Sequence, residues 1–488
     1  MNTDRVPAEE LPDRAGRLLA DGYRIALIAA RHVESSIAIT YLFVAGPPSR
    51  RTELTVQLPA DRPVLPSIAN LSFPAGRFER EMHDLFGVIP EGHPQPRRLV
   101  RHHHWPRGWY PMRHDAGPAP TFGDPEGPFP FLSVQGPGVF EIPVGPVHAG
   151  LIEPGHFRFS VVGESILDLK ARLWFVHRGI EKLFEGVAPA AGTQIAERIS
   201  GDTSLGHGLA YAQAVEDATG TSVPEEAIRL RAVLLELERM HNHAADIGAL
   251  CNDVAHAILH SHAQRIRESL LRINAETTGH RLLRGAVTPG GSRVQSLPDP
   301  DRLDELAADL AEIVALALGN ATVLDRFTGT AILPRADAAA IGTLGYVARA
   351  SGLKIDARIE HSTCDLGPTF TPAVREGGDV LSRFLVRADE FTCSTAVIRR
   401  LLDNLAPGDH TVPLRGASGN GVGLVEGWRG TVTHHVQLDA DGTLGRVKVV
   451  DPSFLNWPAL PVALTGAIVP DFPLANKSFN LSYAGNDL

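Results

Sequence analysis

Three early segments have the residue pattern of β-strands, and they predict a sheet near the N-terminus. The segments are rich in β-branched residues, are separated by turn formers, and cover residues 24–30, 37–44 and 52–58. We therefore expect a small α+β unit at the start of the chain.

Farther along, apolar residues recur at spacings of three and four, which is the period of an amphipathic helix. The segments with this pattern are residues 167–184, 225–260, 301–318 and 389–405. Residues 423–426, 430–438 and 445–450 alternate like strands, with a turn at Asp439-Ala440-Asp441-Gly442. The second unit is thus predicted to be mainly α-helical, with a small β element near its C-terminal end.

Proline and glycine are concentrated in residues 116–145, at a density that no helix interior tolerates. We interpret this stretch as a linker. The expected organisation is an α+β domain at residues 1–115, the linker at 116–145, and a large domain at 146–488. The fold class is α+β.

Composition narrows the functional classes. The net charge of −10 gives no electrostatic reason to expect a nucleic-acid partner. No apolar run approaches the length of a membrane span, and the first twelve residues lack the apolar core of a signal peptide, so we expect a cytoplasmic protein. The three cysteines, Cys251, Cys364 and Cys393, have no close metal-ligand spacing, and they exclude a disulfide framework.

One local string points to a known family. Residues 73–87 read FPAGRFEREMHDLFG, followed by EGHPQPRR at 91–98 and PMRHD at 111–115. This resembles the C component of bacterial NADH:quinone oxidoreductase, which is respiratory complex I. The resemblance implies a salt-bridged docking surface for a neighbouring subunit, and the alternative is that the charges only lace a surface helix. The charged residues concerned are Arg77, Glu79, Arg80, Glu81, Asp84 and Arg113.

From residue 145 onward the resemblance moves to a second polypeptide of the same enzyme. The matching strings include GPVHAGLIEPGHFRF at 145–159, VHRGIEKL at 176–183, ELERMHNH at 236–243 and VTPGGSR at 287–293. They resemble the D component of complex I and the large subunit of energy-converting nickel-iron hydrogenases, such as those of formate hydrogenlyase. The whole chain therefore resembles a fusion of the C and D components.

The hydrogenase pattern contains two cysteine pairs whose thiolates hold nickel and iron. In this chain the first pair of positions is occupied by Ser200 and Thr203, and the closing pair by Ser482 and Gly485. Hydroxyl groups are poor ligands for low-valent nickel or iron, and glycine has no side chain. We expect no nickel-iron centre and no redox cofactor held by this chain itself.

Quinone chemistry is the other activity that the resemblance suggests. In the D component of complex I a histidine and a tyrosine hold the quinone headgroup, but the corresponding positions here fall on Pro154 and Gly201. His148, His156 and His207 lie nearby in the family layout and can titrate near neutral pH. Each could equally be a structural histidine. Quinone is still a candidate ligand, although the histidine and the tyrosine that usually hold its headgroup are absent from this chain.

Other residues gain candidate roles only from the resemblance. It places Glu181 beside the first ligand pair, near His177 and Arg178, where a buried acid could move protons. The alternative is a structural Arg–Glu pair that holds a helix end in place. Arg198 has the same two alternatives, a functional role or a structural one. The candidate catalytic residues are Glu181, His207 and Arg198, and the candidate residues of an acceptor cavity are His148 and Asp487.

Three further patterns receive structural interpretations. The run Arg101-His102-His103-His104 is expected to form an exposed basic turn. His241 and His243 are two apart on a helix, so they face different sides and do not share a metal ion. The glycines of residues 419–423 precede a strand, which argues against a dinucleotide-binding turn.

Together these observations predict a peripheral subunit on the cytoplasmic face of a membrane-bound oxidoreductase complex. Its expected partners are an iron-sulfur small subunit that carries the cluster, a ferredoxin-like subunit, and antiporter-like and other hydrophobic membrane subunits. In the first hypothesis the chain forms one wall of the site where a quinone or another carrier takes electrons. In the second it is a non-catalytic scaffold, and an active hydrogenase is a distant third.

Overall fold

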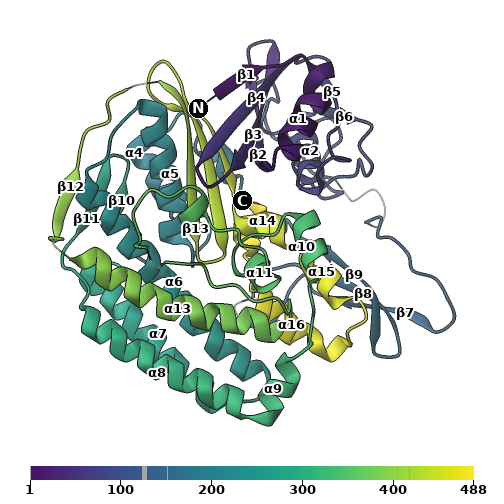
Figure 1. Cartoon of the computed structure of the whole chain (residues 1–488). Coiled ribbons are helices and arrows are strands. Elements are labelled where there is room, and N and C mark those ends of the chain that lie inside the picture. The colour runs from purple at the N-terminus through teal and green to yellow at the C-terminus, as the bar shows by residue number, and fades with distance from the viewer. Residues whose placement is uncertain (1, 124–128, 151, 369, 404, 417) are drawn as a thin grey trace.

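A computed structural model describes most of the chain (Figure 1). The described residues are 2–123, 129–150, 152–368, 370–403, 405–416 and 418–488. Residues 124–128 of the predicted linker, Leu151 of the 145–159 string and Asn404 of the last predicted helix lie outside them.

The N-terminal domain is a four-stranded sheet covered by two helices. The strands are β1 (Asn2–Arg5), β2 (Arg24–Val33), β3 (Ser36–Ala45) and β4 (Arg50–Pro59), in the order β1-β4-β3-β2. The helices are α1 (Leu11–Ala20) and α2 (Phe73–Phe86), and β5 (Val64–Pro66) pairs with β6 (Ile89–Glu91). The three strands predicted from their β-branched residues are confirmed, and so is the α+β fold class.

The charged string on α2 is mostly buried, which corrects the expectation of a surface helix or docking surface. Glu79 and Asp84 have no exposed side-chain area, and Glu81 is 8% exposed. The Asp84 carboxylate accepts hydrogen bonds from the backbone N–H groups of Leu99 and Val100, both 2.8 Å long. These acids therefore fix loops and domain contacts inside the chain itself.

A second sheet of three strands follows the linker. It consists of β7 (Val139–Val144), β8 (His156–Val162) and β9 (Ser165–Arg172). Strand β7 lies within the stretch expected to be linker. The predicted helix at 167–184 is wrong, because its first part is β9 and only α3 (Ile180–Leu183) is helical.

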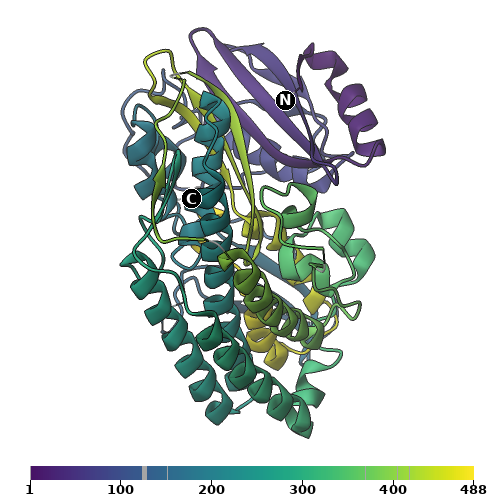
Figure 2. The same cartoon turned by 60° about the vertical axis from the view of Figure 1, so that its left-hand side comes forward.

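The large domain contains a layer of long helices that lie side by side (Figures 1 and 2). Its longer helices are α5 (Ser204–Thr219), α6 (Glu225–Asp253), α7 (Ala257–Thr278), α8 (Pro300–Gly319) and α13 (Val380–Leu402). Shorter ones are α4 (Pro189–Ala196), α9 (Ala321–Phe327), α10 (Arg335–Ile341), α11 (Gly345–Ala350) and α12 (Ala357–Glu360). The prediction of a mainly helical second unit is confirmed, although the segment 225–260 is divided between α6 and α7.

Strands β13 (Gly419–Gly427), β14 (Gly430–Leu438) and β15 (Leu444–Val450) form an antiparallel sheet against α5, as alternation predicted. Glycine allows the close approach, because a Cβ atom on Gly423 would lie 1.9 Å from the carbonyl oxygen of Ala210. A small sheet joins β10 (Val287–Thr288), β11 (Gly291–Val294) and β12 (Gly408–Thr411). The chain then forms α14 (Pro452–Asn456), α15 (Ala459–Leu464), α16 (Phe472–Phe479) and α17 (Tyr483–Asp487).

The N-terminal sheet sits against the edge of the β13–β15 sheet (Figure 2). One apolar cluster spans both domains and includes Leu27, Val450 and Trp457. Arg446 of β15 donates a 3.0 Å hydrogen bond from Nε to the carbonyl oxygen of Ala30 on β2. The two domains therefore share a core.

Within the described part of the chain, no individual helix has both the length and the apolar character needed to cross a membrane. Helices α8 and α9, bent by 86° relative to each other, meet those criteria only as a pair.

Candidate functional site

The positions of the two absent cysteine pairs meet at one buried point. Ser200 and Thr203 lie between α4 and α5, whereas Ser482 caps the N-terminus of α17. The Oγ atoms of Ser200 and Ser482 are 2.9 Å apart and hydrogen-bonded, and Ser482 Oγ also accepts from the backbone N–H of Gly485. Segments 282 residues apart are thus joined by hydroxyl groups.

An ion pair lies beside these hydroxyl groups. Both oxygens of Asp202 accept hydrogen bonds from Arg429, at 2.5 and 2.6 Å, and the Ser200 hydroxyl donates to Asp202 Oδ1 at 3.0 Å. Burial raises the pKa of Asp202, but the Arg429 guanidinium outweighs it and holds the pKa at about 2. The Arg429 side chain is 3% exposed and that of Asp202 is 41% exposed. The site therefore opens to the surface at Asp202.

A chain of three buried residues adjoins the ion pair. His207 Nε2 lies 3.0 Å from Asp451 Oδ2, and His207 Nδ1 lies 3.1 Å from His434 Nε2. Burial and the neighbouring His207 lower the pKa of His434 well below its usual value, so His434 is neutral. With Asp451 ionised, Nε2–H of His207 donates to the carboxylate, and Nδ1 of His207 accepts from Nε2–H of His434. The other ring nitrogen of His434, Nδ1, is then unprotonated and has no partner among the described atoms.

This arrangement does not fit a nickel-iron centre. Three of the four ligand positions offer hydroxyl oxygens that are engaged in hydrogen bonds within the protein. At the fourth position, a Cβ atom on Gly485 would lie 2.5 Å from the Asp451 carboxylate. A side chain at 485 could be accommodated only if Asp451 moved. The donor set is also hard, whereas low-valent nickel and iron in this pattern need thiolates.

Glu181 lies in a separate buried ion cluster. Its carboxylate accepts from Arg446 at 2.6 Å, from Lys448 at 3.0 Å and from the backbone N–H of Val449 at 3.0 Å. Burial raises the pKa of Glu181, but Arg446 and Lys448 outweigh it and lower the pKa to about 2. Lys448 also binds Glu81 of the N-terminal domain at 2.8 Å. Of the two alternatives left open for Glu181, the structure shows an ion pair, but its cations are Arg446 and Lys448 of β15 and not Arg178.

The remaining predicted residues are dispersed. His148 Nε2 lies 2.8 Å from the carbonyl oxygen of Gly155, within the loop between β7 and β8. Asp487 is buried and accepts from the N–H of Val176 at 3.1 Å, and burial raises its pKa to about 6. Arg198 is exposed and donates to the carbonyl oxygen of Gln194. Arg198 therefore does not line the Ser200–Ser482 site.

The histidine interpretations have mixed outcomes. His241 and His243 make separate contacts, with the carbonyl oxygen of Leu237 and with Glu390 respectively, as expected for different helix faces. The basic turn at 101–104 is less exposed than expected, because Arg101 is 3% exposed. His102 contacts the carbonyl oxygens of Leu173 and Trp174, and burial lowers its pKa to about 4.

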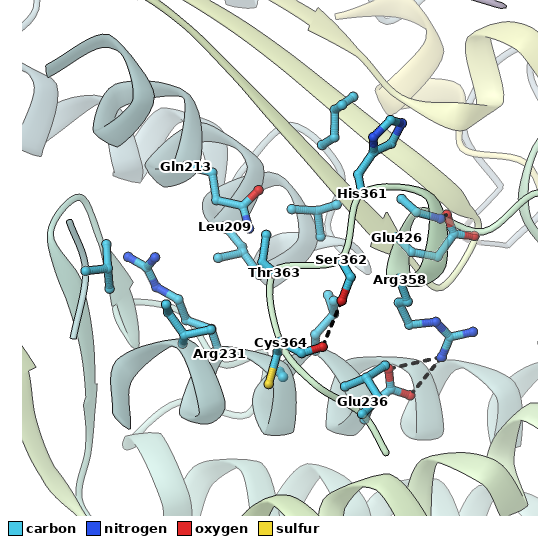
Figure 3. A pocket seen from close by; sticks show the side chains of 18 of the residues that line it. Leu209, Gln213, Arg231, Glu236, Arg358, His361, Ser362, Thr363, Cys364 and Glu426 are labelled. Carbon is cyan, nitrogen blue, oxygen red and sulfur yellow. Dashed lines mark hydrogen bonds and ion pairs between the residues drawn. The ribbon is translucent and has the colours of Figure 1, made fainter. Parts of the chain in front are cut away.

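A cavity of about 220 Å³ lies apart from these residues, between α5, α6 and the loop after α12 (Figure 3). Its walls are mainly apolar, and its charged residues are paired within the protein, as in Arg358 with Glu236 at 3.1 Å and Arg231 with Glu216 at 3.0 Å. None of the candidate site residues lines it. This cavity therefore adds no titratable group to the candidate site.

Sequence reasoning missed Asp202, Arg429 and Asp451. Asp202 stands between two of the substituted ligand positions, which was the available signal. Arg429 and Asp451 are more than two hundred residues away from it in sequence, and only the β13–β15 sheet and the turn into α14 bring them to the site. No local spacing could have indicated that proximity.

Comparison with known proteins agrees with this architecture. The chain is 33% identical to formate hydrogenlyase subunit 5 of Escherichia coli over 451 residues, which cover 88% of this chain and 78% of that protein. It is 34% identical to hydrogenase-4 component G of the same organism, over 84% of this chain and 73% of that protein. The chain belongs to the superfamily of membrane-bound nickel-iron hydrogenase large subunits and their complex I counterparts.

Three family models match successive parts of the chain. Residues 5–121 match the 30 kDa subunit of respiratory-chain NADH dehydrogenase, residues 178–251 match nickel-dependent hydrogenase, and residues 253–420 match the 49 kDa subunit of the same dehydrogenase. A chain from the membrane-bound sulfane sulfur reductase, an archaeal respiratory membrane complex, shares the fold with a TM-score of 0.66 at 24% identity. That likeness covers 72% of this chain and 99% of the other.

Proposed function

We propose that this protein is a peripheral subunit of a membrane-associated complex related to hydrogenases and complex I, and that it holds no nickel-iron centre. The Ser200–Ser482 region forms one wall of an electron-acceptor cavity, beside an iron-sulfur subunit on the cytoplasmic face of the membrane. The observation that carries the proposal is the 41% exposure of Asp202 within an otherwise buried polar site. A neighbouring subunit would close the site over this carboxylate.

The relatives support the assembly. Formate hydrogenlyase subunit 5 and the C/D subunit of NADH-quinone oxidoreductase from Phocaeicola vulgatus are by name subunits of larger enzymes, and the latter is 29% identical over 80% of this chain. By extension the partners of this chain include a ferredoxin-like subunit, antiporter-like membrane subunits and the iron-sulfur subunit. A quinone or another carrier would be the acceptor.

The groups available at the wall are acid–base groups. The Asp202–Arg429 pair supplies fixed charges, and Asp451, His207 and His434 form a hydrogen-bonded chain. Asp487 has its pKa raised to about 6 by burial, which places its proton affinity near the working pH. Glu181 is held as an anion by two cations, so it has no proton to move at neutral pH.

The second candidate function is a non-catalytic scaffold. It is favoured by the hydroxyl groups at the former ligand positions, whose hydrogen bonds are made within the chain. In a scaffold, the Ser200–Ser482 contact would only hold α17 against the loop before α5.

One experiment separates these functions. The intact complex is purified with wild-type subunit, with Asp202→Asn and with Asp487→Asn, and is assayed for nickel, hydrogen-dependent dye reduction and quinone reduction. We expect the purified complex to contain no stoichiometric nickel. In at least one of the two variants the rate of acceptor reduction should fall at least about tenfold, while the complex still assembles. Unchanged acceptor reduction in both variants would favour the scaffold. Stoichiometric nickel or hydrogen uptake would overturn the central proposal.

A further inference from the structure

A second cavity, of about 400 Å³, lies between the two domains and has a strongly basic lining. It is bounded by the first half of α2, by the loop at residues 93–99, by β9 and by the start of α15. The charged residues that line it are Arg77, Arg80, Arg97, Lys170, Arg172 and Asp168. This concentration of cations contrasts with the net charge of −10 of the whole chain.

The carboxylates near the cavity do not neutralise the arginines. Asp168 lies 3.7 Å from Lys170, which also binds Glu141 at 3.1 Å. No described carboxylate lies within 4.0 Å of Arg77, Arg80, Arg97 or Arg172. Lys170 is thus paired with carboxylates, whereas the guanidinium groups of the four arginines are not.

The hydrogen bonds of these arginines go mainly to backbone carbonyl groups. Arg80 donates to the carbonyl oxygens of Arg97 and Arg98 at 2.8 and 3.0 Å, and Arg172 donates to that of Arg101 at 3.1 Å. The Nε atoms of Arg77 and Arg172 are buried and have no hydrogen-bond partner in the described part of the chain. A ligand in the cavity can reach the exposed Arg97 directly, whereas these two Nε atoms are closed off from it.

The arginines also repel one another. Burial, followed by the neighbouring Arg80, lowers the pKa of Arg77 to about 9. Burial and Arg97 lower the pKa of Arg80 to about 10, and burial lowers that of Arg172 to about 10. The carboxylates of Glu81 and Asp84 offset this effect only in part, because neither lies within 4.0 Å of Arg77, Arg80 or Arg172, so an anion in this cavity would be bound favourably.

Aromatic rings add a second recognition element. The guanidinium of Arg172 lies 4.8 Å from the ring centroid of Phe129, and that of Arg77 lies 5.7 Å from the ring of Trp174. Phe131 and Trp457 also line the cavity. The rings that line the cavity offer faces to an apolar or planar group beside the cations.

We propose that this inter-domain cavity binds the phosphate group of a ligand that also carries an apolar or aromatic body. Phosphate fits better than a single carboxylate, because it brings up to two negative charges and three acceptor oxygens to several guanidinium forks. The cavity adjoins α17, because Arg77 donates a 3.5 Å hydrogen bond to Asn486 Oδ1, but Ser200, Thr203, Ser482 and Gly485 do not line it, and its ligand goes beyond the role proposed above. The phosphate could come from a soluble molecule or from a lipid headgroup.

The test uses the purified full-length chain and isothermal titration with phenyl phosphate, inorganic phosphate and benzoate. We expect phenyl phosphate to bind at least about tenfold more tightly than benzoate, which corresponds to about one charge-assisted hydrogen bond. Arg77→Gln and, separately, the exposed Arg97→Gln should each weaken phenyl phosphate binding about tenfold. Arg62→Gln, an exposed arginine outside the cavity, is the matched control and should have less than about a twofold effect.

A sedimentation arm distinguishes the source of the phosphate. Vesicles of phosphatidylcholine with phosphatidic acid are compared with vesicles of phosphatidylcholine alone, using the same three variants. Binding to acidic vesicles that is lost in Arg77→Gln supports a lipid headgroup. Binding of phenyl phosphate in the calorimetric titration, without binding to vesicles, supports a soluble ligand. The proposal is overturned if no phosphate compound binds, if benzoate binds equally well, or if neither cavity variant weakens binding.

Discussion

Replacing Glu181 by glutamine should destabilise the chain measurably, because the buried cluster depends on its negative charge. The carboxylate is 6% exposed and binds Arg446 and Lys448. The fall of its pKa from 4.5 to about 2 corresponds to about 3 kcal/mol of stability at neutral pH. Breaking a buried pair costs about 3–5 kcal/mol, and the lower figure applies because Lys448 keeps Glu81 as a partner.

The sign of the pH dependence follows from the lowered pKa. A carboxylate with a depressed pKa stabilises the fold above its ordinary pKa of 4.5, and this contribution is lost as the pH falls towards 2. The difference between wild type and Glu181→Gln should therefore be largest at pH 7 and should shrink below about pH 4.5.

The assay is urea unfolding followed by tryptophan fluorescence, from pH 7 to the lowest pH at which the wild type stays folded. Glu185→Gln is the matched control on the next turn. Among the described residues the ion-pair partner of Glu185 is the exposed Lys182, so this substitution should cost less than about 1 kcal/mol. If the two variants unfold at the same urea concentration at pH 7, Glu181 is not the buried anion that joins the two cations.

Three further outcomes are expected. Gly423→Ala should destabilise the protein by at least about 3 kcal/mol in urea unfolding, because the added methyl overlaps a carbonyl of α5, whereas Gly201→Ala, with open space around it, should change stability by less than about 0.5 kcal/mol. Asp487 has a raised pKa, so wild type should lose up to about 3 kcal/mol relative to Asp487→Asn as the pH rises from 4 to 7; a stability difference between the two that stays constant over this pH range would contradict its burial as an acid. The double variant Ser200→Cys with Ser482→Cys should lose two free thiols on mild oxidation, and each single variant should lose none; full thiol titration of the oxidised double variant would contradict the 2.9 Å contact.

The strands were predictable from their runs of β-branched and apolar residues. Strands β2, β3 and β15 are buried along most of their length, so both of their faces are covered and an unbroken apolar run is what such strands show. The long helices α6 and α8 were predictable because their apolar stripes face a core.

Strand β9 was mistaken for a helix for a specific reason. Its buried residues are Ile166, Leu169 and Arg172, a spacing of three that imitates a helix. The pairing with β8 shifts register at Ser160, so one extra residue of β9 is accommodated in a bulge and the side chains on either side of it face the core. Periodicity alone cannot separate these cases.

The candidate site was only partly predictable. The resemblance to the family located Ser200, Thr203, Ser482 and Gly485. The burial of the site residues and their hydrogen-bond and ion-pair partners are set by residues far away in sequence. Glu181 shows this clearly, because its partners lie on β15, more than 260 residues away, rather than on the neighbouring arginine. Charge partners over such separations leave no trace in local spacing.

The hydroxyl contact between Ser200 and Ser482 bears on how the polypeptide matures in the cell. Where metal ligands join distant segments, folding free energy is coupled to metal supply. Here the junction is closed by the chain's own serines and by the Asp202–Arg429 pair. The amount of correctly folded subunit should therefore be the same in nickel-starved and nickel-replete cells, and α17 can dock without waiting for an insertion step.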